Sequence, residues 1–190
     1  MFNQKLFSIL QVFAQALFSF SFLSTLIKSA NDVDYVEWSV SFSIVSAIFS
    51  LNIFSGVLFN KFIASGNYST NIIFLNAIGL IIISTLMIIY GLFSNANIFF
   101  YLAILFASVM QLHLSLCNMV DGLGKLIARC KTQIIIFIIF SLALFLAMHL
   151  NISIVPILIL ALLSYTFIGI ICIFIVAANK SWDFSFPQYD

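Results

Sequence analysis

The sequence predicts an all-α integral membrane protein that crosses the bilayer six times. Of its 190 residues, 64% are hydrophobic and only 7% are charged, and the mean hydropathy is +1.23. Soluble domains carry about 25% charged residues, so this composition cannot cover a water-facing surface. The apolar residues fall into six runs, each long enough to cross a hydrocarbon core about 30 Å thick as a helix. The runs are uniformly apolar, whereas strands of a membrane barrel alternate lipid-facing and lumen-facing residues.

Each predicted helix is bounded by a short polar break. The first, Leu6–Ile27, is too long for a signal peptide and lacks a small-residue cleavage pattern, so we expect it to remain as a helix. The spans that follow are Trp38–Phe59, Asn71–Phe93, Ile98–Val120, Thr132–Leu150 and Ile154–Ala178. The breaks between spans are SANDVDYVE, NKFIASGNYST, SNAN, DGLGKLIARCK and NIS. We expect a transmembrane domain over residues 1–180 and a cytoplasmic aromatic tail over 181–190.

The break DGLGKLIARCK contains glycines and a lysine, but it does not fit a phosphate-binding loop. Such a loop needs four residues between its glycines and a Ser or Thr after the lysine. Here Gly122 and Gly124 are separated by one residue, and Leu126 follows the lysine. We expect a cytoplasmic loop in which the glycines let the chain turn back. Its charged residues have a spacing of four and could pair along one helix end: Asp121, Lys125 and Arg129.

The basic residues predict the orientation. Six of them fall on one side of the predicted topology: Lys5, Lys61, Lys125, Arg129, Lys131 and Lys180. The opposite side has Lys28, accompanied by Asp32, Asp34 and Glu37. Because Lys and Arg accumulate in cytoplasmic loops, we expect a multi-pass protein of the cell inner membrane with both termini in the cytoplasm.

Polar side chains form a stripe along three of the spans, at the steps of three and four residues that mark one helix face. The stripes are Gln4, Ser8, Gln11, Gln15 and Ser19; Ser39, Ser43, Ser46 and Ser50, with Asn52 and Ser55 nearby; and Ser108, Gln111, Ser115 and Asn118. Polar side chains inside a membrane face partner helices or water, so the stripes are expected to line one hydrophilic cavity. The alternative for the serines is close helix–helix contact. The other three spans are nearly unbroken Ile, Leu and Phe, and we expect them to face lipid or to lie on the outside of the bundle.

No Asp, Glu, Lys or Arg lies in the middle of a predicted span, although an ion-coupled carrier ordinarily keeps a carboxylate there. The enzyme motifs HExxH and GxSxG are also absent. We therefore expect no enzyme activity, no metal, no cofactor and no nucleic-acid partner; an interfacial site using Asp121 is the one enzymatic alternative. His113 lies off the third stripe and His149 ends a span, so both are expected to be structural or interfacial rather than proton relays. The cysteines lack CxxC spacing and are expected to be packing residues: Cys117, Cys130 and Cys172.

Four segments carry a resemblance to a known family. A glutamine-bearing first span, LFSILQVFAQALFSF, is followed by an outer loop that ends in DYVEWS. The second span closes with LNIFSGVLFNKFIA, and the fourth runs into LCNMVDGLGKLIARCKTQI. Together they resemble the amino-terminal half of the polysaccharide (O-antigen) flippases of the multidrug/oligosaccharidyl-lipid/polysaccharide exporter superfamily.

This resemblance implies a fold and a substrate. Such flippases look like a twelve-helix, MATE-type fold built from two six-helix halves around a central cavity. They move polyprenyl-pyrophosphate-linked oligosaccharide to the periplasmic leaflet for lipopolysaccharide biosynthesis. The present chain is about half that length, so we expect either a truncated product, or a homodimer or a pair with a separate carboxyl-terminal half.

The resemblance also gives the polar residues candidate roles. A pyrophosphate requires cations at the cytoplasmic mouth, and the candidates are Lys61, Lys125 and Arg129. The alternative for each is topology and contact with lipid headgroups. Sugar hydroxyls require amides and hydroxyls in the cavity, and the candidates are Gln11, Gln15, Ser46, Asn52, Gln111 and Asn118.

Two other classes of function compete with transport. One is a small non-transporting membrane protein or subunit that binds a partner through its spans. The other is a membrane-embedded glycosyl or acyl transferase.

Overall fold

The computed structural model describes residues 2–50 and 70–178, and within these ranges the chain is helical, with no strand. Its helices are α1 (Phe2–Ser29), α2 (Asp32–Ser50), α4 (Thr70–Phe93), α5 (Ile98–Gly122), α6 (Leu126–His149) and α7 (Ile154–Ala177). All of them except α2 are long and apolar enough to cross a membrane. The predicted all-α, polytopic fold is confirmed. Residues 51–59 of the predicted second span and the predicted tail at 181–190 lie outside the described residues.

The turns between the later helices owe their shape to single residues with a left-handed backbone. Asn95, Gly124 and Asn151 have φ values of 51°, 71° and 50°, a region that glycine and asparagine tolerate best. After α5, the N–H of Gly124 donates to the carbonyl of Asp121 at 2.9 Å, and the N–H of Lys125 donates to that of Val120 at 3.0 Å. This pair of bonds is a Schellman motif, so the predicted turn at Gly124 is confirmed.

α2 and α6 begin well before the starts that the hydropathy predicts. The predicted break SANDVDYVE supplies the start of α2, because the side chain of Asn31 accepts a hydrogen bond from the N–H of Asp34 at 2.7 Å and caps the helix. In DGLGKLIARCK the chain resumes a helix at Leu126, directly after the Schellman turn. Asp121 and Arg129 do pair, but the prediction that they lie along one helix end is wrong: Asp121 lies in the last turn of α5, and Arg129 lies in the first turn of α6.

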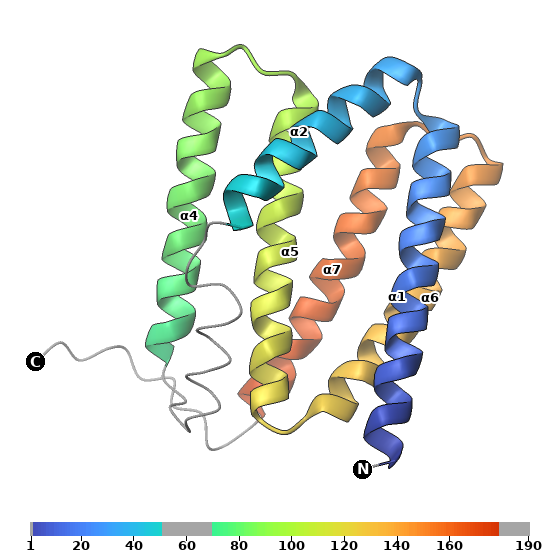
Figure 1. Cartoon of the computed structure of the whole chain (residues 1–190), viewed down its shortest axis with the longest axis vertical. Helices are drawn as coiled ribbons and strands as arrows, with labels where there is room; N and C mark the ends of the chain where they lie inside the picture. The colour runs from blue at the N-terminus through green and yellow to red at the C-terminus, as the bar shows by residue number, and fades with distance from the viewer. Residues whose placement is uncertain (1, 51–69, 179–190) are drawn as a thin grey trace, which may run out of the picture.

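The helices do not pack in chain order (Figure 1). α1 and α6 run side by side in the same direction and make the most extensive contact in the described bundle. At one end the ammonium of Lys131 lies 5.2 Å from the centre of the Phe7 ring, and at the other the Thr25 hydroxyl donates to the carbonyl of Leu144 at 3.1 Å. On the other side of the bundle, α2 and α4 pack against α5, and α7 connects α5 with the α1–α6 pair.

Aromatic rings join these two sides. Phe18 of α1 stacks on Phe137 of α6, with ring centres 5.0 Å apart, and meets the edge of Tyr165 of α7 at 5.8 Å. Tyr165 in turn lies 6.0 Å from Phe106 of α5, which lies 5.7 Å from Trp38 of α2. We call these five residues the aromatic cluster. One set of interlocked rings thus holds five helices together.

α6 and α7, expected to face lipid or to lie outside the bundle, expose one apolar face and bury the other. α7 packs against α1, α5 and α6, and its buried residues include Ala161, Ser164 and Gly169. A Cβ on Gly169 would lie 3.5 Å from the Leu116 side chain, so α5 and α7 are in close contact there. Small residues that permit such approach hold membrane helices together, and they leave no polar stripe in the sequence.

Candidate functional site: a polar cavity beside the α5–α6 turn

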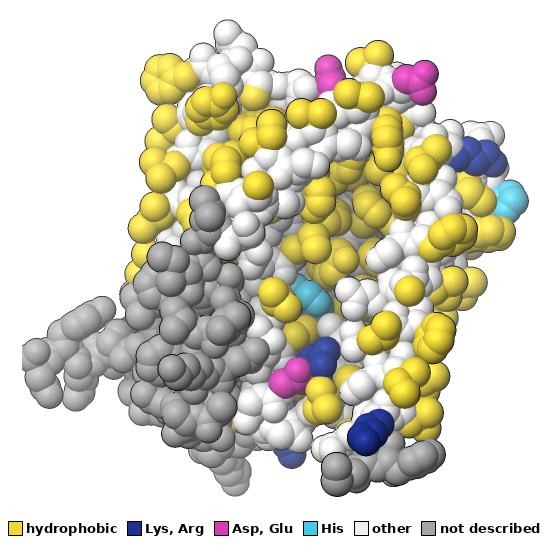
Figure 2. All heavy atoms as spheres, viewed as in Figure 1, with side chains coloured by type: hydrophobic (Ala, Val, Ile, Leu, Met, Phe, Trp, Pro, Cys, Tyr) yellow, Lys and Arg dark blue, Asp and Glu magenta, His cyan; other side chains and the backbone are white. Residues whose placement is uncertain are grey.

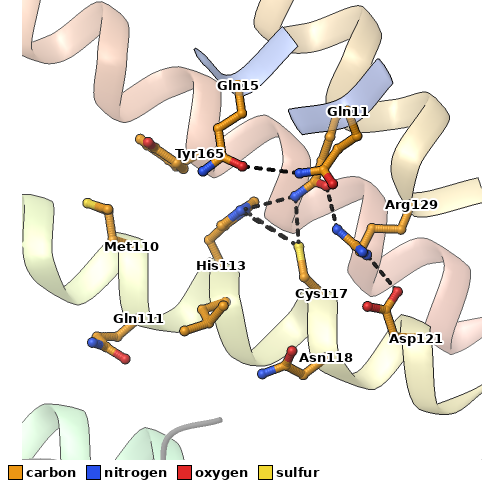
Figure 3. Close-up of a pocket in the computed structure, with 12 residues that line it drawn as sticks. Gln11, Gln15, Met110, Gln111, His113, Cys117, Asn118, Asp121, Arg129 and Tyr165 are labelled. Carbon is orange, nitrogen blue, oxygen red and sulfur yellow. Dashed lines mark hydrogen bonds and ion pairs between the residues drawn. The ribbon is translucent and has the colours of Figure 1, made fainter. Parts of the chain in front are cut away.

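A cavity of about 360 Å³ lies between α1, α5, α6 and α7. Figure 3 shows how its polar side chains come together from these helices. On the corresponding face of the molecule, Figure 2 shows a hollow between apolar walls that contains histidine, basic and acidic side chains. The lining residues are Gln11, Gln15, Met110, Gln111, His113, Leu114, Cys117, Asn118, Asp121, Arg129, Gln133 and Tyr165.

The polar side chains at one end of the cavity form a continuous hydrogen-bonded network. The Nε of Arg129 donates to Oδ1 of Asp121 at 2.6 Å, across the α5–α6 turn. Its Nη1 donates to Oε1 of Gln133 at 2.6 Å, one turn along α6. The amide nitrogen of Gln133 then reaches Nε2 of His113 and the sulfur of Cys117, both at 3.4 Å. We call these five residues the Arg129 network.

The Schellman turn explains why the charged ends of the network meet. It reverses the chain within three residues, Leu123–Lys125, so the last turn of α5 and the first turn of α6 are adjacent. The Asp121 carboxylate and the Arg129 guanidinium are then held together with side chains 32% and 13% exposed. A charge-assisted bond of this length in a mostly apolar site fixes both side chains.

The opposite wall of the cavity belongs to α1. The Gln11 amide donates to Oε1 of Gln15 at 3.1 Å, and Figure 3 shows both side chains reaching toward the Arg129 network. Gln15 is exposed on the surface of the chain and Gln11 is half-buried. These amides therefore keep hydrogen-bonding capacity that the described part of the protein does not use.

The aromatic cluster lies next to the cavity, one helical turn toward the end of the bundle where α1 meets α2. Phe18 follows Gln15 on α1, Phe137 follows Gln133 on α6, and Tyr165 belongs to both the cluster and the cavity wall. The His113 ring lies edge-on to Tyr165 with centres 5.2 Å apart. The polar residues of the cavity thus lie between the aromatic cluster and the α5–α6 turn.

Four of the six predicted sugar-binding candidates line the cavity: Gln11, Gln15, Gln111 and Asn118. In Figure 3, Gln111 and Asn118 point away from the Arg129 network. Ser46 of α2 is not among the lining residues, and Asn52 lies outside the described residues. In the described structure, the stripes of α1 and α5 meet at one cavity, and the stripe of α2 does not reach it.

Two serines of the α5 stripe serve helix packing instead. The Ser115 hydroxyl accepts a hydrogen bond from the amide of Asn76 on α4 at 2.6 Å. Ser108 lies 3.0 Å from Ser84, also on α4. The alternative interpretation, close contact between helices, therefore holds for these two residues.

The three cations predicted to bind pyrophosphate differ in where they lie relative to the cavity. Arg129 lies in the cavity wall. Lys125 is exposed in the turn and is not a lining residue, and Lys61 lies outside the described residues. Of the described cations, Arg129 alone lines the cavity.

The lining residues that were not predicted as site residues include His113, Gln133 and Tyr165. His113 lies two residues from Gln111, and the cavity-facing side of α5 is wide enough to contain both. Gln133 is the one amide in its span, and no stripe marks it. A search for single amides in apolar spans would have found Gln133, because such a residue needs a partner inside the membrane. His113 lies off the polar stripe of its own helix, so no helix-face pattern marks it.

The arrangement provides hydrogen-bond donors and acceptors around one ion pair. Among the described residues, no group of three or more His, Cys, Asp or Glu side chains is placed to hold a metal ion. The cavity volume falls in the range of small-ligand sites, about 300–1,000 Å³. It can therefore hold a polar headgroup or a sugar.

Comparison of the chain with protein-family models, with curated proteins and with solved structures finds no match.

Proposed function

We propose that this chain is one half of a carrier for lipid-linked oligosaccharides in the inner membrane. The observation that carries the proposal is the polar cavity between α1, α5, α6 and α7, helices that are long and apolar enough to cross a membrane. It presents the amides of Gln11 and Gln15 opposite the guanidinium of Arg129. Amides suit sugar hydroxyls, and a guanidinium suits a phosphate.

The exposed polar residues of α1 support a second half. Gln15 and Ser19 are exposed on the surface of the chain, and polar side chains inside a membrane usually face a partner helix or water rather than lipid. A second copy of this chain, or a separate carboxyl-terminal half, would cover this face and enclose the cavity. The resemblance to two-half flippases has the same consequence.

The proposed orientation places the α5–α6 turn, and with it the polar end of the cavity, in the cytoplasm. The substrate would then enter from the leaflet where it is made. A periplasmic reporter fused after Lys180 should be inactive, and strong periplasmic activity would overturn the orientation.

The carrier proposal is tested by removing the two amides of α1. We expect Gln11→Ala combined with Gln15→Ala to abolish export of surface polysaccharide in a complementation assay. Gln4→Ala is the matched control, since Gln4 is an exposed glutamine of the same helix outside the cavity. Unchanged export in the double variant, at normal protein abundance, would refute the cavity's role in transport.

The alternative is a non-transporting subunit that uses the same exposed polar face to bind a partner. The mass of the protein in mild detergent separates the two arrangements of a carrier: a homodimer supports two identical halves, and a monomer requires a separate half. If the chain co-purifies with a different membrane protein and no glycan is exported, the subunit interpretation replaces the carrier.

A further inference from the structure

The direction of each hydrogen bond in the Arg129 network can be worked out from Arg129. A guanidinium only donates, so the oxygen of the Gln133 amide must face Arg129 and its NH₂ group must face His113. An NH₂ group does not accept hydrogen bonds. Nε2 of His113, 3.4 Å from that nitrogen, must therefore accept, and the ring must be neutral with its hydrogen on Nδ1.

Protonation of His113 disrupts this arrangement. Both ring nitrogens of an imidazolium carry hydrogen, so Nε2–H would point at the Gln133 NH₂ group. The Gln133 amide could relieve the clash by rotating its oxygen toward His113. Arg129 Nη1, now 2.6 Å from that oxygen, would then lose its acceptor. The amide of Gln133 can serve either Arg129 or a protonated His113, but not both.

The charges around His113 determine how its protonation affects the binding of an anion in the cavity. The titratable and charged groups of the described helices near His113 are Cys117 and Asp121 on α5, Arg129 on α6, and Tyr165 and Cys172 on α7. α1 contributes the neutral amides of Gln11 and Gln15. With His113 neutral, Arg129 and Asp121 balance. With His113 protonated, these lining residues carry one excess positive charge, which is unfavourable in apolar surroundings unless an anion joins it.

We infer that His113 is a proton-binding group that controls the Arg129 guanidinium, so that proton uptake and anion binding in this cavity reinforce each other. The inference rests on the proposed function in that it treats the cavity as a substrate site. It adds the proton linkage, and the anion concerned is a tetrahedral oxyanion such as phosphate, either free or on a lipid. Linkage is reciprocal: if a proton tightens anion binding, the anion tightens proton binding by the same factor.

The tautomer can be tested without any transport assay. Nitrogen-15 NMR of the full chain in lipid nanodiscs, with His149→Gln to remove the second imidazole, should show His113 neutral and protonated on Nδ1 at about pH 8. Gln133→Glu replaces the amide with a carboxylate, which only accepts, and should move hydrogen to Nε2. An Nε2–H tautomer in the unsubstituted network, or no change in Gln133→Glu, would overturn the inference.

The linkage is tested with anions whose own charge is constant. Calorimetry should measure binding of inorganic sulfate and of an isoprenyl sulfate from about pH 8 to about pH 5. Affinity should rise by up to about tenfold per pH unit as the pH falls, the limit for one proton bound with one anion. The dependence should disappear in His113→Asn and in a second variant, His113→Gln.

The two ligands identify the source of the anion. Linked binding of both supports a free or lipid-borne oxyanion, and linked binding of the isoprenyl sulfate alone supports a lipid headgroup. Binding that does not change with pH, or no binding of either anion, overturns the coupling. Because the carrier proposal is decided by export and this inference by NMR and calorimetry, the failure of one is distinguishable from the failure of the other.

Discussion

The ion pair between Asp121 and Arg129 should contribute to stability in a way that a double-mutant cycle detects. The two groups lie 2.6 Å apart, and the Arg129 side chain is the more buried at 13% exposed, against 32% for Asp121. Asp121→Ala leaves a guanidinium in the cavity with Gln133 as its one hydrogen-bond partner among the described residues. Arg129→Ala leaves a carboxylate that water can reach more easily.

The expected loss in the free energy of unfolding follows from how exposed each of the two side chains is. Removing one partner of a fully buried pair costs about 3–5 kcal/mol, and a hydrogen bond to a charged group contributes about 1.5–3 kcal/mol. Because this pair is partly exposed, we expect Asp121→Ala to lower the free energy of unfolding by about 2 kcal/mol and Arg129→Ala by about 1 kcal/mol. The double variant should lose about 2 kcal/mol rather than the sum, which gives a coupling of about 1 kcal/mol.

The assay is reversible unfolding in mixed detergent, followed by circular dichroism. Lys125→Ala is the matched control, because Lys125 is an exposed cation in the same turn and its removal should change stability by less than about 0.5 kcal/mol. Additive losses in the double variant would show that the two side chains do not stabilise one another, and the reasoning about the network would be refuted.

Three further predictions concern the fold, and all are measured by the same unfolding assay. Gly124→Ala should lower the free energy of unfolding by about 1 kcal/mol, because φ is +71° at this position even though there is space for a Cβ. Gly124→Asn should lower it by less, and equal losses in the two variants would contradict this. Phe18→Ala should lower the free energy of unfolding by about 3 kcal/mol, because the Phe18 ring packs on Phe137. Phe20 is 71% exposed on the same helix, so Phe20→Ala should be nearly neutral. Similar losses in the two variants would argue against a stabilising role of the aromatic cluster. Ser115→Ala should cost about 0.6 kcal/mol by removing its bond to Asn76 on α4, and no loss would mean that the bond does not join α4 to α5.

The helices were predictable because their cause is local. Each apolar run must form a helix to satisfy its backbone within lipid, and the structure places five membrane-length helices on the predicted runs. The errors occur at helix starts, where capping replaces hydropathy as the deciding interaction. Asn31 starts α2 within a polar segment, and α6 begins directly after the turn at Gly124.

The site was predictable only in part. The glutamines of α1 and α5 were found because they repeat along a helix face. Gln133 was missed because it is the single amide of an apolar span, and His113 was missed because it lies off the polar stripe of α5; the role of each depends on another helix. Their partnership joins residues 20 positions apart in the sequence, and no periodicity in either helix indicates it.

The sequence by itself determined that this protein is a bundle of membrane-length helices, where most of those helices lie and that glycine lets the chain turn back after α5. Lipid thickness, backbone hydrogen bonding and left-handed glycine are properties of short segments. Only the tertiary structure decided that α1 lies beside α6, that α7 packs against α1, α5 and α6, and that Arg129, Gln133 and His113 meet. Inside a bilayer an apolar helix face contacts lipid or another helix with little difference in transfer free energy, so hydrophobicity alone does not choose its neighbour. That choice is made by small residues, interlocking rings and polar pairs between helices.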